Sequence, residues 1–414
     1  MMSVSRRRFV EALTLGGGML ANAKAFASTE PVSAVQAADP TASHIGNLYE
    51  FVQKQADRSP LELSFLHSKF KNLKQWQPGA RAKVFEHLFY DPPRVAPQAE
   101  LVRRTDRGDY VEEYLTVRTT PDLRIPVCVL IPKQAKFPAP GILALHSHDG
   151  MYLWGKEKIV ENDREHPVLT EFKQRRYGGK SIAAELARQG YVVAVTDMLY
   201  WGERRMLLAN DPPAYRERPL TMTEAEIGAF DQRASQNESL LGRSLMTAGV
   251  TWPGVLLWDD IRALDYLASR PEVDAKRLGC VGLSVGGYRS FLLAALDERI
   301  RVAVDVGWMT SFASQIKQHA IYTIGLSFHI IGLYRYLDLP DLAALIAPRA
   351  VLVINGSQDR LFELNGVKAA FEKVARCYAK AGVPESQKCS LYDAPHEFNP
   401  EMQAEAWRWI KRWL

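Results

Sequence analysis

The chain has 414 residues, of which 47% are hydrophobic and 24% charged, and its formal net charge at pH 7 is +5. This balance is typical of a globular protein with a sizeable core, and it argues against a disordered or fibrous chain. The small net charge gives no support for nucleic-acid binding. After the N-terminal segment, no apolar run approaches the roughly 20 residues that span a bilayer.

The N-terminus carries a targeting pattern. The segment Ser-Arg-Arg-Arg-Phe-Val-Glu at residues 5–11 precedes an apolar, glycine-containing stretch, and Ala25 and Ala27 form an A-x-A cleavage site. This arrangement resembles a twin-arginine signal peptide. We therefore expect residues 1–27 to be removed and the protein to be periplasmic or secreted. The alternative is a basic tail with no targeting role.

Residues 41–92 have apolar positions at helical spacing and end at Pro92-Pro93. We assign residues 28–108 to an N-terminal helical extension and residues 109–414 to the main domain. In that domain, short β-branched runs alternate with amphipathic helical stretches, which predicts an α/β fold with a mostly parallel sheet and helices on both faces. The strand-like runs are Leu123–Ile131, Gly141–His146, Tyr191–Thr196, Leu278–Leu283, Val302–Val306, Ala350–Ile354 and Ser390–Tyr392; the main helical patterns are Ser181–Arg188, Trp258–Ser269, Arg289–Leu296, Gly366–Lys380 and Met402–Trp413.

Two stretches interrupt this alternation, at about residues 151–178 and 201–253. Both are polar and aromatic and contain turn residues. They follow predicted strands, and ligands bind beyond the carboxyl ends of the strands in open α/β sheets. We therefore expect lid-like insertions that form part of a pocket wall.

The strongest motif is Gly-Leu-Ser-Val-Gly at residues 282–286, which follows an apolar strand pattern and precedes a helical one. This G-x-S-x-G motif in a strand–turn–helix context predicts a sharp turn that exposes the hydroxyl of Ser284 as a nucleophile. The glycines are expected because a Cβ at either position would collide with neighbouring backbone. A glycine-rich loop without chemistry is the alternative.

A serine nucleophile needs an imidazole base, and the imidazole needs a carboxylate to fix its tautomer. Asp359 follows the predicted strand Val351–Ile354, and His396 lies after the last predicted strand. The chain order Ser284, Asp359, His396 is the order of α/β-hydrolases. We predict these three residues as the catalytic triad, with Asp393 as a substitute for Asp359.

Two backbone N–H groups must hold the oxyanion of such a reaction. We expect one from Val285 and the other from His148, in the loop His146-Ser147-His148-Asp149-Gly150. The same loop has a metal-binding interpretation, because H-x-H followed by aspartate is similar to a binuclear metallohydrolase ligand set. Since Gly150 stands where that motif has a histidine, we predict no metal.

Further candidates for substrate binding are Arg204 as a partner for a carboxylate, and Trp154, Trp201, Trp252 and Trp308 as walls of an apolar pocket. Each also has a structural interpretation: Arg204 could lock the insertion by pairing with Glu203 or Asp197, and the tryptophans could belong to the core. The four cysteines are too scattered for a disulfide framework or a zinc site. Cys128 and Cys280 lie in apolar runs and are expected to be free, whereas pairing of Cys377 with Cys389 stays open.

The chain resembles the dienelactone hydrolase and acetyl-xylan-esterase-like branch of the α/β-hydrolases. The resemblance rests on the sharp turn at residues 282–286, here called the elbow, on the Gly-x-x-Asp turn at residues 356–359, on the Pro-His pair at residues 395–396 and on the histidine loop at residues 146–150. The resemblance covers about residues 122–414. It implies an α/β-hydrolase fold and hydrolysis of small-molecule carboxylic esters through an acyl-enzyme, without a metal or organic cofactor. The chain departs from the small dienelactone hydrolases in having Ser284 where they have cysteine.

Other functions remain open at this point. A peptidase or amidase of the prolyl-oligopeptidase type would use the same triad, but the region before the main domain is too short for a β-propeller. A metallohydrolase centred on His146 and His148, or a binding protein on a hydrolase scaffold, are further alternatives. The sequence does not indicate which ester is cleaved or what oligomer forms.

Overall fold

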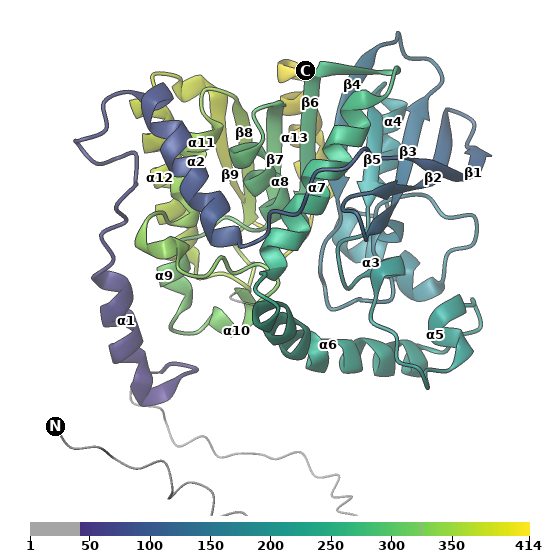
Figure 1. Cartoon of the computed structure of the whole chain (residues 1–414), viewed down its shortest axis with the longest axis horizontal. Helices are drawn as coiled ribbons and strands as arrows, with labels where there is room; N and C mark the ends of the chain where they lie inside the picture. The colour runs from purple at the N-terminus through teal and green to yellow at the C-terminus, as the bar shows by residue number, and fades with distance from the viewer. Residues whose placement is uncertain (1–41, 324) are drawn as a thin grey trace, which may run out of the picture. The chain divides into compact units, whose positions relative to one another are not determined.

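The structure is a computed structural model that describes residues 42–323 and 325–414. The predicted signal peptide, residues 1–27, lies outside the described residues. A nine-stranded sheet organises the chain (Figure 1). The strands are β1 (Glu100–Asp106), β2 (Tyr110–Arg118), β3 (Arg124–Pro132), β4 (Ala139–Leu145), β5 (Val192–Thr196), β6 (Val273–Leu283), β7 (Ile300–Val306), β8 (Ala350–Gly356) and β9 (Gln387–Tyr392).

The order of strands across the sheet is β1-β2-β3-β5-β4-β6-β7-β8-β9. The first three pairs in this order, β1-β2, β2-β3 and β3-β5, are antiparallel. The remaining five pairs, from β5-β4 to β8-β9, are parallel. The predicted α/β class with a mostly parallel sheet is confirmed. Because parallel strands end at the same edge, the loops after β4, β6, β7, β8 and β9 meet there.

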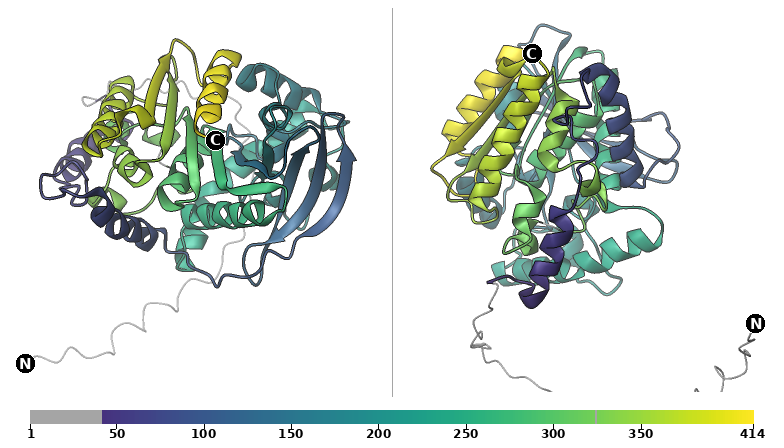
Figure 2. Two further views of the ribbon diagram at one scale, coloured as in Figure 1. Left: turned by 90° about the horizontal axis from the view of Figure 1, so that it is seen from above. Right: turned by 90° about the vertical axis from the view of Figure 1, so that its left-hand side faces the viewer.

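Helices cover both faces of the sheet. Figure 2 shows α4 and α13 on one face and α7 on the other, and α8 packs against β6 and β7. The helices are α1 (Tyr49–Asp57), α2 (Leu73–Leu88), α3 (Pro167–Tyr177), α4 (Ile182–Arg188), α5 (Pro213–Glu217), α6 (Glu224–Thr247), α7 (Trp252–Ser269), α8 (Val285–Leu296), α9 (Phe312–Gln315), α10 (Ala320–Thr323), α11 (Ala343–Ile346), α12 (Leu364–Lys380) and α13 (Pro400–Trp413).

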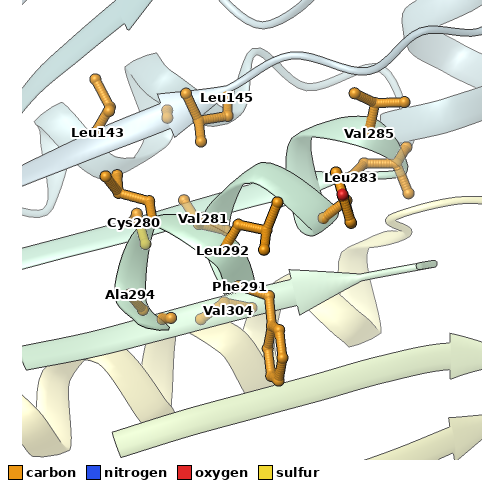
Figure 3. Packing of buried hydrophobic residues seen from close by; sticks show 14 of the residues in the cluster. Leu143, Leu145, Cys280, Val281, Leu283, Val285, Phe291, Leu292, Ala294 and Val304 are labelled. Carbon is orange, nitrogen blue, oxygen red and sulfur yellow. The ribbon is translucent and has the colours of Figure 1, made fainter. Parts of the chain in front are cut away.

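Part of the core lies between the central strands and α8, all of whose residues are buried. Leu145 at the end of β4, Val281 on β6, and Phe291 and Leu292 on α8 belong to this buried cluster (Figure 3). These side chains are at most 2% exposed. Strands buried on both faces read as continuous apolar runs, which is why the sequence located β4 to β8 well. This packing fixes the start of α8, and with it the residue before that helix, Ser284.

The sequence analysis missed the first two strands. β1 lies inside the segment assigned to the helical extension, because nearly all of its residues are exposed and no apolar alternation marks it. β2 has a buried carboxylate, Glu112, which pairs with Arg103 and Arg107 and breaks the expected apolar pattern. The predicted helical character of residues 41–92 is confirmed in α1 and α2.

Both insertions contain helices. Residues 151–178 hold the short 3-10 helix η2 (Lys156–Lys158) and α3, and residues 201–253 hold α5 and the 24-residue α6. A capping box starts α6: the hydroxyl of Thr223 accepts from the backbone N–H of Glu226, whose carboxylate accepts from the N–H of Thr223. The four cysteines are free in the structure, so Cys377 and Cys389 are not paired.

Candidate active site

Ser284 lies in a strained turn between β6 and α8. Its backbone has φ 60° and ψ −128°, a conformation that residues other than glycine rarely adopt. Its N–H donates to the carbonyl of Val306 at 2.7 Å, which ties the turn to β7. A Cβ at residue 282 would lie 2.4 Å from the carbonyl carbon of Gly286, and one at residue 286 would lie 2.1 Å from the carbonyl oxygen of Leu145. Glycine is therefore required at both positions.

Asp359 and His396 come from the loops after β8 and β9. Nδ1 of His396 lies 2.6 Å from Oδ2 of Asp359, and Oδ1 of Asp359 accepts from the N–H of Leu361 at 2.9 Å. The two loops pack closely, since a Cβ at residue 356 would lie 2.2 Å from the carbonyl oxygen of Ala394. The carboxylate is thus held on Nδ1 of the ring, so in the neutral imidazole Nδ1 carries the hydrogen and Nε2 is the nitrogen that can accept one.

Asp393 does not reach the imidazole. It is exposed, and its Oδ1 accepts from the hydroxyl of Ser357 and from the side-chain amide of Gln358. Its position favours Asp359 over the substitute that the sequence left open.

A cavity of about 380 Å³ lies over this edge of the sheet. Ser284 and His396 both line it, although they are only 4% and 7% exposed. Nε2 of His396 is buried and has no hydrogen-bond partner among the described residues. The remaining lining residues are His148, Asp149, Gly150, Tyr152, Arg176, Ser235, Val285, Glu238, Trp308, Gly325, Phe328 and Leu361.

The loop after β4 places His148 and Asp149 in the same cavity as Val285. Within the part of the chain that the structure describes, no hydrogen bond occupies the backbone N–H of His148 or of Val285. Asp149 has a positive φ of 53° and pairs with Nε of Arg176 at 2.8 Å. Burial alone would raise the pKa of Asp149, but the Arg176 guanidinium and other nearby positive groups hold it below its ordinary value.

The two histidines of this loop make hydrogen bonds within the protein. Nε2 of His146 accepts from the N–H of Met198 at 3.1 Å, so its Nδ1–H faces the carbonyl of Ser147 at 2.9 Å. Nδ1 of His148 accepts from the N–H of Gly150, and its Nε2 lies 2.8 Å from Glu238. The described residues contain no group of three or more side chains able to hold a metal.

Of the residues predicted to bind substrate, Trp308 lines this cavity, and Arg204, Trp154, Trp201 and Trp252 do not. Trp201 is fully buried and stacks on Tyr152, because its large apolar ring is better placed in the core. Trp154 faces a different, strongly charged cavity. Arg204 has the structural role that was the alternative, although it forms its ion pair with Asp259, at 2.8 Å, and reaches only the backbone carbonyl of Asp197.

Both insertions do reach the cavity, through residues that the sequence analysis did not single out. Tyr152 and Arg176 come from the first insertion, and Ser235 and Glu238 come from α6 in the second. Glu238 accepts from the hydroxyl of Tyr152 at 2.9 Å, and Arg176 donates to the carbonyl of His396. The insertions were expected to form a pocket wall, but these four residues carry no local sequence signal.

A sequence model of the dienelactone hydrolase family matches residues 177–398, more than half of the chain. The chain belongs to the dienelactone hydrolase family. The match includes the elbow, the loop with Asp359 and the loop with His396. Membership makes the chain an enzyme that hydrolyses carboxylic esters.

This dienelactone hydrolase family member is also similar to individual proteins. It is 27% identical to "Putative hydrolase YtaP" of Bacillus subtilis (strain 168) over 334 residues, which cover 81% of the chain and 98% of the relative. Its structure is similar to that of "a putative acetyl xylan esterase" from Bacteroides fragilis, with TM-score 0.64, 19% identity and 84% of both chains covered. A glucuronoyl esterase from Solibacter usitatus gives TM-score 0.57 and 16% identity, covering 83% of this chain and 94% of that one.

These likenesses to solved structures show that this family member has the α/β-hydrolase fold. Among its described residues, no helix combines the length and the apolar character needed to span a membrane.

Proposed function

We propose that the protein is a serine carboxylesterase that cleaves short-chain esters through an acyl-enzyme, with Ser284 as nucleophile, His396 as base and Asp359 as the residue that orients the base. The observation that carries the proposal is that His396 lines the same cavity as Ser284, with its Nδ1 held by Asp359 and its Nε2 without a partner among the described residues. An imidazole with one free nitrogen and a serine in a strained turn, both lining one cavity, are the groups that nucleophilic catalysis requires.

In the first half-reaction, Nε2 of His396 takes the proton of the Ser284 hydroxyl while Oγ bonds to the ester carbonyl carbon. The carbonyl oxygen becomes an oxyanion. When the intermediate collapses, the bond to the alcohol oxygen breaks and the imidazolium returns its proton to that oxygen. Water then adds to the acyl-enzyme by the same steps, and the acid and the free serine are released.

The backbone N–H groups of Val285 and His148 are the donors we assign to the oxyanion. Both residues line the cavity, and both N–H groups lack a partner among the described residues. The N–H of Val285 also lies in the first turn of α8, where the helix dipole favours negative charge.

The cavity supports a substrate with a small acyl group and a polar alcohol. Trp308 and Phe328 give it an apolar wall, while Tyr152, Ser235 and Glu238 present polar groups. A volume of about 380 Å³ is at the small end for ligand sites. The acetyl and glucuronoyl esters named for the structurally similar esterases are consistent with this composition.

The test is steady-state hydrolysis of p-nitrophenyl acetate, butyrate and octanoate by the wild type and by Ser284→Ala, with and without a chelator. We expect acetate and butyrate to be cleaved and the variant to lose at least about 10³-fold in kcat. Ser290→Ala is the matched control, since Ser290 is a buried serine of α8 whose hydroxyl bonds to the carbonyl of Gly286. Activity that survives in Ser284→Ala would contradict the proposal, and activity that chelation abolishes would favour a metallohydrolase.

We also propose that residues 1–27 direct export by a twin-arginine pathway and are then removed. The support is the arginine pair before Phe9 and the A-x-A site at residues 25–27. Replacing Arg6 and Arg7 together by lysine is expected to leave the uncleaved protein in the cytoplasm of the producing bacterium. Unchanged cleavage and export of that variant would refute the assignment.

A further inference from the structure

Lys158 is a buried lysine directly behind the loop that carries His148. It belongs to η2, in the first insertion, and its side chain is fully buried. Its ammonium donates to the carbonyl oxygens of Ser147 and of His148, each at 2.9 Å. A buried ammonium is costly unless it is paired or hydrogen-bonded, so these two contacts require explanation beyond packing.

The two carbonyl oxygens belong to the peptide units on either side of His148. The Ser147 carbonyl shares its peptide unit with the N–H of His148, which is the donor we assign to the oxyanion. Nδ1–H of His146 also donates to that carbonyl, so its oxygen accepts two hydrogen bonds. A peptide unit held this way has a fixed orientation, and a cation at its oxygen polarises its N–H toward stronger donation.

We propose that Lys158 is a positioning residue for the oxyanion hole: it fixes the peptide unit between Ser147 and His148 and strengthens the N–H that holds the reaction's negative charge. This inference rests on the proposed function, because it assigns Lys158 a role in the same serine mechanism. Lys158 touches no substrate and acts only through the backbone of the loop.

Two opposing effects act on the charge of Lys158: nearby carboxylates stabilise the ammonium, and burial destabilises it. The carboxylates that face it are Asp149 on the loop, Asp231 on α6, Glu157 on η2 and Asp197 after β5, while the ring of Phe172 on α3 lies 5.7 Å from its nitrogen. Burial outweighs these carboxylates and lowers the pKa of Lys158 to about 8. The adjacent His146 is kept neutral, because burial and the charge of Lys158 lower the pKa of its ring well below the ordinary value.

Lys158→Met tests the proposal, because methionine keeps the apolar stem and removes the charge and both hydrogen bonds. The oxyanion exists only in the transition state, so we expect kcat per titrated active site to fall about 10²-fold while KM changes by less than about threefold. Lys173→Met is the control: Lys173 is a buried lysine of the same insertion that donates to the carbonyl of Val160 at 2.7 Å, pairs with Glu165, and has no hydrogen bond to the loop among the described residues. We expect it to lower stability and leave kcat unchanged.

A Lys158→Met protein with kcat within about twofold of the wild type would overturn the proposal. If that variant does not fold, the pH profile decides. The wild type is expected to lose kcat as pH rises through about 8, and Lys158→Arg, which stays charged, is expected to lack this decline. A decline of kcat of the same size in the wild type and in Lys158→Arg would overturn the proposal, because an arginine keeps its charge over this pH range.

Ser284→Ala, measured in parallel, separates the two claims. If Ser284→Ala is inactive and Lys158→Met is unimpaired, the role of Lys158 is refuted and the triad stands. If Ser284→Ala remains active, the serine mechanism itself is refuted.

Discussion

Asp305 gives the sharpest stability prediction. It lies on β7 beneath the elbow, is fully buried, and neither carboxylate oxygen has a hydrogen-bond partner among the described residues. Burial raises its pKa from 3.8 to about 8. The Asp305 side chain fits there because residue 287 is glycine: a Cβ at position 287 would lie 2.4 Å from Oδ1 of Asp305. At neutral pH this carboxyl is therefore protonated in the folded protein and ionised in the unfolded chain.

The sign and size of the pH effect follow from this difference. Between about pH 4 and pH 8 the folded state holds one proton more than the unfolded state, so the contribution of Asp305 is complete below about pH 4 and is lost as pH rises through about 8. From pH 5 to pH 7.5 the loss amounts to about 3 kcal/mol. Asp305→Asn has nearly the same shape and no titration, so it should escape the loss.

Urea unfolding of the wild type and of Asp305→Asn at pH 5 and pH 7.5, followed by tryptophan fluorescence, measures this effect. We expect the variant to gain about 3 kcal/mol on the wild type between the two pH values, with no gain for Asp122→Asn, an exposed control. The reasoning about Asp305 is refuted if the difference between wild type and Asp305→Asn is the same at both pH values.

Three further predictions concern the site and the core. Asp359→Asn should lower kcat about 10³- to 10⁴-fold with little change in KM, because the amide favours the wrong imidazole tautomer; an unaffected kcat would point to another acid. Gly286→Ala should lower the free energy of unfolding by at least about 2 kcal/mol and remove most activity, since the new Cβ would lie 2.1 Å from the Leu145 carbonyl oxygen. Gly228→Ala, on the exposed face of α6, should raise that free energy by about 0.5 to 1 kcal/mol in the same thermal melts. Thiol titration in denaturant without reductant should count four free cysteines, and a count of two would reveal a disulfide.

The parts of the fold that sequence reasoning located are those in which local pattern and burial coincide. The runs that form β4 to β8 are buried on both faces, so their composition alone marks them as strands. The elbow was located because its geometry imposes a residue type at two positions, Gly282 and Gly286, around Ser284. Strand β2 was missed because the charged residue Glu112 is buried in it, paired with Arg103 of β1 and with Arg107 of the turn between the two strands.

The pocket could not be predicted for a related reason. Glu238 and Arg176 lie in the pocket because of how helices α6 and α3 pack, and no motif in the sequence around either residue predicts a place in the pocket. Trp201 and Trp154 have side chains of a type that often lines apolar pockets. In the structure Trp201 packs in the core against Tyr152, and Trp154 lines a separate cavity. Lys158 sits in a Lys-Glu-Lys run that looks solvated in sequence, and only the tertiary structure brings its ammonium to the carbonyls of the loop.

The most direct test of the central claim is to trap the acyl-enzyme. Wild-type protein is quenched in acid during turnover of p-nitrophenyl butyrate and examined by intact-mass and peptide mass spectrometry, with His396→Ala and Ser284→Ala as controls. The account predicts the added mass of one butyryl group on the peptide that contains Ser284, and no such adduct in Ser284→Ala. Butyrate released by an active enzyme with no adduct at Ser284, or with the adduct on another residue, would contradict it.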